Sequence, residues 1–209
     1  MATVLYLFDF DKTLYAYDFR ERLPALARLT GTSEYHLAKS WWSEGHEAAA
    51  EAGEYATTDE YLEAFGEVTG TRLTLEQWVQ ARQAAMTPIP ASIAVLRRAA
   101  ELGTVSLLSN NPIIFRDALP VLAPEVHEIL GGNDLVSAAL GARKPERRIY
   151  TRACDRFGVP PERAFLVDDS GANVRGAADA GLEAFEFLPV GHGYNTEHLR
   201  EAVESFATA

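Results

Sequence analysis

Short, uninterrupted apolar runs constrain the fold of this 209-residue chain more than any other feature of its sequence. The clearest are residues 4–8, 104–109 and 164–169, and residues 182–188 and 135–140 form weaker examples. Because apolar and polar residues do not alternate in them, these runs are typical of strands that are buried on both faces, as in parallel sheets. We therefore predict a parallel sheet that is covered by helices on both sides.

Helical patterns fill the gaps between these runs, at residues 90–103, 144–158, 171–181 and 195–207. The first three of these segments end at a glycine, which is a common helix stop signal. Strand and helix thus alternate from residue 90 onward. This alternation predicts an α/β fold with a doubly wound parallel sheet.

The stretch from about residue 15 to residue 87 has a different character, because it is helical in pattern and contains no convincing strand. Thr57 and Thr74 each begin a capping-box pattern, and residues 87–90 resemble a hinge or linker. We therefore predict two domains: an α/β core made of residues 1–14 and 90–209, and an inserted α-helical cap made of residues 15–89.

Two adjacent tryptophans, Trp41 and Trp42, lie in this helical stretch. They are expected either to line a substrate pocket from the cap or to pack between the cap and the core, since helical spacing buries one of any adjacent pair.

Composition narrows the classes of function and of partner. With 47% apolar residues, the chain can build a sizeable core, and its net charge of −11 opposes binding to nucleic acids and to anionic membranes. No apolar run reaches the length of about 20 residues that a membrane-spanning helix needs. The single cysteine, Cys154, excludes an internal disulfide and suits a reducing compartment. We expect a soluble cytoplasmic protein, a monomer or a homodimer, with neither a nucleic-acid nor a membrane partner.

Polar and charged residues follow three of the predicted strands at the point where each strand ends. In open α/β sheets, ligands bind outside the carboxyl ends of the strands, where such side chains meet. Carboxylates there can bind Mg²⁺ or attack phosphorus, and hydroxyl, amide and ammonium groups can hold phosphoryl oxygens. The residues concerned are Asp9, Asp11, Ser109, Asn110, Asn111, Asp168 and Asp169, together with Lys144 at the start of a helix.

Four short motifs built on these residues occur in order along the chain: "DFDKT" (9–13), "LLSNN" (107–111), "RKPE" (143–146) and "FLVDDSGANVRGAADAG" (165–181). In this set and order the sequence resembles the haloacid dehalogenase (HAD) superfamily of hydrolases, in the subclass that carries a helical cap after the first strand. The resemblance extends over the whole chain. It implies a Rossmann-like core and a Mg²⁺ cofactor.

The resemblance also implies roles for the acidic residues. Asp9 would be the nucleophile and a Mg²⁺ ligand. Asp11 would be the general acid/base, with its main-chain carbonyl on the metal. Asp169 would be a direct metal ligand, and Asp168 would act behind it or through water.

The remaining motif residues would hold the phosphoryl group or support the loops. Ser109 and Asn110 would bind the transferring phosphoryl group, and Lys144 would bridge that group and the Asp9 carboxylate. Thr13 would brace the first loop, and Asn173 would orient the acidic loop.

Asp11 separates two branches of this superfamily. Dehalogenases carry a non-acidic residue two positions after the nucleophile, because a halide leaves without a proton, whereas an alkoxide leaving group needs one. The chain is therefore expected to be a Mg²⁺-dependent phosphatase of a small phosphorylated metabolite, such as a sugar phosphate or a nucleotide-like monoester. Its motifs are most similar to those of sugar-phosphate phosphatases and the phosphatase domain of epoxide hydrolases. The alternatives are a phosphomutase of the same fold, a 2-haloacid dehalogenase and a non-catalytic binding protein.

Overall fold

The computed structural model describes residues 4–208, and at its centre is a four-stranded sheet. All pairings in this sheet are parallel and the strand order is β4-β1-β5-β6, so the predicted α/β fold with a parallel sheet is confirmed. The strands are β1 (Leu5–Phe8), β4 (Thr104–Leu107), β5 (Ala164–Asp168) and β6 (Glu183–Glu186).

Strand β1 lies inside the sheet and sends alternate side chains into two separate apolar clusters. Leu5 and Leu7 join one cluster, and Tyr6 and Phe8 join the other. Helices cover both faces, which is why β1 and the first four residues of β5 are apolar throughout. The first cluster is closed by helices α10 (Arg147–Phe157) and α11 (Gly171–Ala180), and the second by α6 (Pro90–Leu102), α7 (Ile113–Leu122), α8 (Pro124–Leu130) and α12 (Thr196–Thr208).

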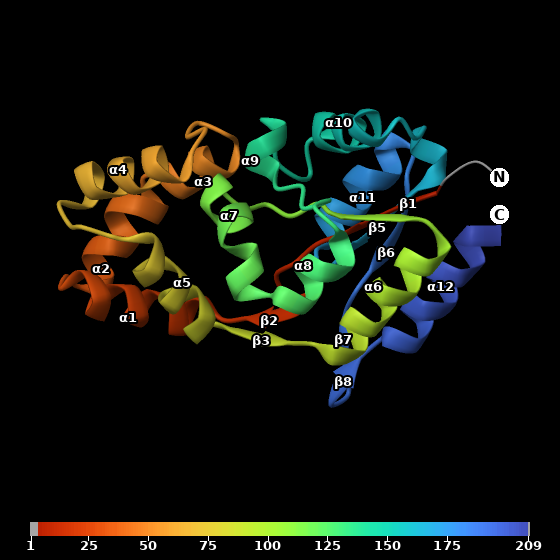
Figure 1. Cartoon of the computed structure of the whole chain (residues 1–209), viewed down its shortest axis with the longest axis horizontal. Coiled ribbons are helices and arrows are strands. Elements are labelled where there is room, and N and C mark those ends of the chain that lie inside the picture. Colours follow the sequence, from red (N-terminus) through yellow and green to blue (C-terminus); the bar gives the residue numbers. More distant parts are fainter. Residues whose placement is uncertain (1–3, 209) are drawn as a thin grey trace.

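A group of helices lies beside the sheet at one end of the molecule, at the left of Figure 1. Helix α5 packs against both α1 and the core helix α7, α4 also packs against α7, and α3 packs against the short helix that follows residue 136, so this group meets the sheet domain through several of its helices. The capping box predicted at Thr74 is present, since Thr74 and Gln77 exchange side-chain to backbone hydrogen bonds. The helices are α1 (Phe19–Thr30), α2 (Glu34–Leu37), the π-helix η1 (Ala38–Ser43), α3 (His46–Glu51), α4 (Thr58–Thr69) and α5 (Leu75–Ala84).

Two short strands join these helices to the rest of the chain and correct one expectation. Strands β2 (Tyr15–Tyr17) and β3 (Met86–Pro88) form an antiparallel pair, whereas the sequence shows no convincing strand between residues 15 and 87. Each strand has only three residues, which is too short to produce a recognisable pattern. The segment expected to be a hinge, residues 87–90, thus contains the last two residues of β3, one loop residue and the first residue of α6. The domain limits themselves, 14/15 and 89/90, stay a prediction.

A second expectation was wrong at residues 135–140, where the sequence favours a weak strand. Val136 makes only an isolated bridge to Ser109, and the following residues form the short helix α9 (Ser137–Leu140). The segment "SAAL" consists mostly of good helix formers and ends at Gly141, which has a left-handed φ of 61°.

The remaining elements are small. They are the 3₁₀-helix η2 (Pro161–Arg163) and the hairpin of β7 (Pro189–Val190) and β8 (Gly193–Tyr194). No helix within residues 4–208 combines the length and apolarity that crossing a bilayer requires.

Candidate active site

Three carboxylates meet at the carboxyl edge of the sheet. Asp9 follows β1 directly, and its backbone N–H continues the sheet by donating to the carbonyl of Val167 at 2.9 Å. Asp168 ends β5 and Asp169 follows it, so the parallel register of β1 and β5 brings all three acids together. One carboxylate oxygen from each lies within 4.8 Å of the others. Such a set of oxygen ligands fits a hard divalent cation, whose charge would offset the repulsion among the acids.

Lys144 lies against two of these acids and is itself buried, with 4% of its surface exposed. Its Nζ is 3.0 Å from Oδ1 of Asp9 and 2.5 Å from Oδ2 of Asp168. Burial lowers the pKa of Lys144, but the two carboxylates outweigh burial and the net pKa is raised. Lys144 therefore carries its positive charge at neutral pH.

Asp9 combines burial with neighbouring charges of both signs. Burial raises the pKa of Asp9, and the charge of Asp168 adds to the rise. The ammonium of Lys144 and a hydrogen bond from Ser109 oppose it. The pKa of Asp169 is also raised, first by burial and then by the charge of Asp168. Burial is the main cause of both shifts, and the charge of Asp168 adds to each.

The two adjacent aspartates face different surroundings. Asp168 is fully buried, and its Oδ1 accepts hydrogen bonds of 2.9 Å from the backbone N–H of Ser170 and from Nδ2 of Asn173. Asp169 lines the cavity described below, together with Asn173, whereas Asp168 is not among the lining residues. The roles predicted for this pair, Asp169 as the direct metal ligand and Asp168 behind it or acting through water, stay a prediction.

The predicted phosphate-binding residues lie beside Asp9 but are engaged unequally. Ser109 is buried, and its hydroxyl accepts a 2.9 Å hydrogen bond from Nδ2 of Asn111. The side-chain amide of Asn110 bonds the backbone of Lys144 in both directions, accepting at 2.9 Å and donating at 3.0 Å. Asn110 therefore fixes the position of Lys144. Thr13 is buried too, and its hydroxyl has no hydrogen-bond partner within the part of the chain that the structure describes.

Asp11 points toward the helical group and contacts a residue that the sequence does not single out. Nη2 of Arg82, in the last turn of α5, lies 2.6 Å from both carboxylate oxygens of Asp11. Nδ2 of Asn111 donates to Oδ2 of Asp11 at 3.3 Å. Arg82 is one of many basic residues on predicted helices, and no local pattern marks it.

The site opens into a cavity of about 210 Å³. Asp9, Asp11 and Asp169 line it, so a ligand in this cavity would contact three of the four acids. The other lining residues come from the same four motifs, apart from Tyr17 on β2: Lys12, Tyr17, Ser109, Asn110, Lys144 and Asn173.

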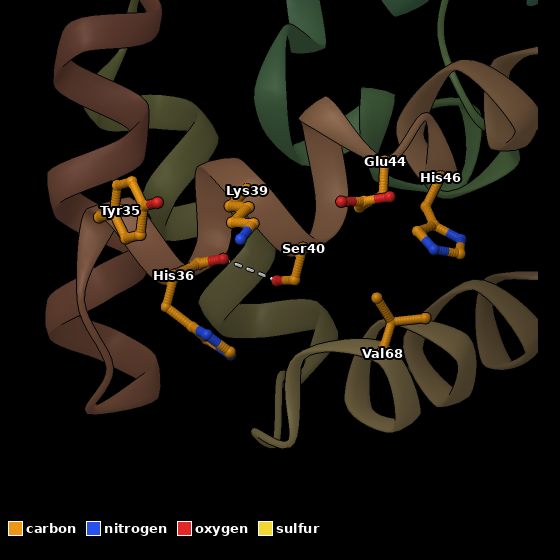
Figure 2. Close-up of a pocket in the computed structure, with 7 residues that line it drawn as sticks. All are labelled: Tyr35, His36, Lys39, Ser40, Glu44, His46 and Val68. Atoms are coloured by element: carbon orange, nitrogen blue, oxygen red, sulfur yellow. Dashed lines mark hydrogen bonds between the residues drawn. The ribbon is translucent and has the colours of Figure 1, made fainter.

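A larger hollow of about 540 Å³ lies elsewhere, on the helical group (Figure 2). His36 and His46 come from different helices there, and the one carboxylate among the labelled residues is Glu44. His36 is already engaged, since its Nε2 is 2.8 Å from the carbonyl oxygen of Thr69. The hollow lacks a convergent set of acids, so the smaller cavity at Asp9 is the candidate active site. Trp41 is fully buried and packs on Phe65 of α4, so it packs inside the helical group and lines neither of the two cavities.

Comparison with known proteins agrees with this geometry. The family model for haloacid dehalogenase-like hydrolases matches residues 4–181, which is most of the chain and includes all four motifs. The chain belongs to this hydrolase family. The family assignment inferred from the motifs is thereby confirmed.

Individual relatives are more distant. The protein CbbY of Cereibacter sphaeroides is 32% identical over 108 residues, which is 52% of this chain and 41% of that protein. Among solved structures, a HAD family enzyme from Bacteroides thetaiotaomicron, in complex with magnesium and inorganic phosphate, is 19% identical, with a TM-score of 0.74 over 95% of this chain and 99% of that one. A 2-haloacid dehalogenase from Pseudomonas syringae pv. Tomato DC3000 is 18% identical, with a TM-score of 0.67 over 98% of this chain and all of that one. At these identities, the structural matches show a shared fold.

Proposed function

We propose that this protein is a Mg²⁺-dependent phosphatase that hydrolyses a small phosphorylated metabolite through an aspartyl-phosphate on Asp9. The observation that carries the proposal is the convergence of the Asp9, Asp168 and Asp169 carboxylates within 4.8 Å, with Lys144 3.0 Å from Asp9. A phosphate ester is an anion, and the three carboxylates with Lys144 alone leave a net negative charge that opposes its binding, so positive charge has to be added at the site. Bound Mg²⁺ would supply that positive charge and polarise the phosphoryl oxygens. The magnesium and inorganic phosphate held by the Bacteroides fold neighbour support this ligand pair.

In the proposed reaction, Asp9 attacks phosphorus and the ester bond to the leaving oxygen breaks. Lys144 holds one Asp9 oxygen, so the other is free to act as the nucleophile. Ser109 and the backbone around Asn110 line the cavity where the phosphoryl oxygens would lie, and they stabilise the transferring group. Asp169 would hold the cation directly, while Asp168 fixes Lys144 and the start of the acidic loop. Thr13 and Asn173 support the two loops.

Asp11 has the role of the general acid/base. It donates a proton to the departing alkoxide and then takes one from the water that attacks the aspartyl-phosphate. Asp11 lines the same cavity as Asp9, which supports a part for it in both steps. A dehalogenase needs no such acid, so the presence of Asp11 favours phosphate esters over 2-haloacids as substrates.

A panel of phosphorylated metabolites, assayed for release of inorganic phosphate with Mg²⁺ and with EDTA, tests this proposal. We expect Mg²⁺-dependent release from at least one sugar phosphate or nucleotide-like monoester, and none from the Asp9→Asn variant. An isomerised sugar phosphate as the main product would indicate a phosphomutase, and chloride release from 2-chloropropionate would indicate a dehalogenase. The absence of turnover on every substrate would favour a binding protein.

A further inference from the structure

Arg82 connects the helical group to the general acid/base. It lies in the last turn of α5, 71 residues away from Asp11 in sequence, and is 2% exposed. Its Nη2 bonds both carboxylate oxygens of Asp11 at 2.6 Å. Because α5 packs against the core helix α7, this contact crosses from the helical group to the loop that follows β1.

The guanidinium of Arg82 is held in place by aromatic rings. Its Cζ lies 4.4 Å from the ring centroid of Tyr17 and 5.0 Å from that of Phe115. Tyr17 is on β2 and Phe115 is on α7, so the two rings come from opposite sides of the junction between helices and sheet. Cation–π contacts with both rings fix the plane of the guanidinium and leave Nη2 directed at Asp11.

Apart from Asp11, the Arg82 side chain has few polar partners among the described residues. Its Nε has no hydrogen-bond partner among residues 4–208, and Nη2 lies at the outer limit, 3.5 Å, from Oδ1 of Asn111. A buried arginine is costly unless its charge is paired, and here Asp11 is the acid that pairs with it. The ion pair therefore explains why an arginine is buried at this position.

We propose that Arg82 is a positioning residue: it sets the orientation of the Asp11 carboxyl group, so that proton transfer to the leaving group depends on how α5 sits against the core. The proposal rests on the proposed phosphatase function and extends it to a residue outside the four motifs. Removing Arg82 leaves the Asp11 carboxyl with the 3.3 Å bond from Asn111 as its one remaining side-chain hydrogen bond within residues 4–208. The carboxyl group would then rotate away from the leaving oxygen for part of the time.

The leaving group distinguishes this role from a merely structural one. The 4-nitrophenolate ion departs from p-nitrophenyl phosphate without a proton, whereas the alkoxide of an alkyl phosphate needs one from Asp11. General acid catalysis contributes about 10²–10⁴-fold when it operates. We expect Arg82→Met to lower kcat/KM, which reports the steps up to departure of the leaving group and not hydrolysis of the aspartyl-phosphate, by about 100-fold for the best alkyl phosphate of the panel and by about fivefold for p-nitrophenyl phosphate.

Two further variants complete the design. Arg82→Lys keeps the charge but loses the planar fork, so it should show the same preference for p-nitrophenyl phosphate at a smaller loss. It also provides the test if Arg82→Met does not fold. Arg28→Met, an exposed arginine on α1, is the matched control and should leave both rates unchanged. In an Asp11→Asn background, Arg82→Met should change the residual turnover of p-nitrophenyl phosphate by less than about twofold, because the group it positions is already gone.

The outcomes separate the two proposals. Equal losses of kcat/KM on both substrates, or a full additional loss in the Asp11→Asn background, would overturn the role of Arg82 and leave the phosphatase proposal standing. Failure of the wild-type protein with Mg²⁺ to hydrolyse either substrate would overturn the phosphatase proposal and this inference with it.

Discussion

Replacing Lys144 with methionine should destabilise the metal-free protein strongly. Lys144 is 4% exposed and lies 3.0 Å from Asp9 and 2.5 Å from Asp168. At an effective dielectric constant of about 20, the attraction between two unit charges 3.0 Å apart is about 5–6 kcal/mol. Burying the ammonium costs several kcal/mol, which offsets part of this attraction. Methionine fills the same space but leaves two acids buried without a counter-charge. Breaking a buried ion pair in this way costs about 3–5 kcal/mol of the free energy of unfolding.

Urea denaturation in EDTA, followed by circular dichroism, measures this loss. Lys39→Met is the matched control, because Lys39 is exposed on η1 and its loss should change the free energy of unfolding by less than about 0.5 kcal/mol. The destabilisation by Lys144→Met should be larger at pH 8 than at pH 6. Burial already raises the pKa of Asp9, and without Lys144 this acid would take up a proton at the lower pH and lose its charge. A Lys144→Met variant as stable as the Lys39→Met control at pH 8 would refute the reasoning.

Three other perturbations test separate parts of the site. Asp9→Asn should lower turnover at least about 10³-fold while the thermal midpoint stays within about 5 °C of wild type; near-full activity would exclude Asp9 as the nucleophile. Mg²⁺ at 100 times its Kd should raise the free energy of unfolding by about 2.7 kcal/mol, and Asp169→Ala should abolish that gain in thermal unfolding scans; an unchanged gain would place the metal elsewhere. Burial, and next the charge of Glu47, raises the pKa of Glu51 from 4.5 to about 7, with the Arg143 ion pair opposing the rise. The folded state then binds the Glu51 proton more tightly than the unfolded state does, so this residue should make the free energy of unfolding fall by up to about 3 kcal/mol as pH rises from 4.5 to 7. Urea denaturation at pH 5 and 8 should show this contribution in the wild type and not in Glu51→Gln, and the same pH dependence in both proteins would contradict the assignment.

The site could be located from the sequence because its residues follow strand ends. Asp9 and Asp168 each come at the end of an unbroken apolar run, and the parallel register of two such strands brings their ends to one edge of the sheet. Lys144 could be predicted as a site residue for a different reason, because it belongs to the "RKPE" motif. The geometry of the predicted set therefore follows largely from the strand pattern and the motif order.

The contacts between the helical group and the sheet domain could not be predicted from the sequence in the same way. Arg82 reaches Asp11 because α5 packs on α7, and tertiary packing of this kind leaves no periodic trace in a single sequence. Asn110 was expected to bind phosphate, and the structure adds that its side chain holds the backbone of Lys144. Such partner choices depend on three-dimensional distances that residue type alone does not specify.

The central claim is that Asp9 takes the phosphoryl group from an ester, and trapping the covalent intermediate tests it most directly. The protein, mixed with Mg²⁺ and ³²P-labelled acetyl phosphate and quenched in acid within milliseconds, should carry label that peptide mapping assigns to Asp9. The label should be absent from the Asp9→Asn variant and from samples with EDTA. Label on another residue, or phosphate release by a protein that never becomes labelled, would contradict the account.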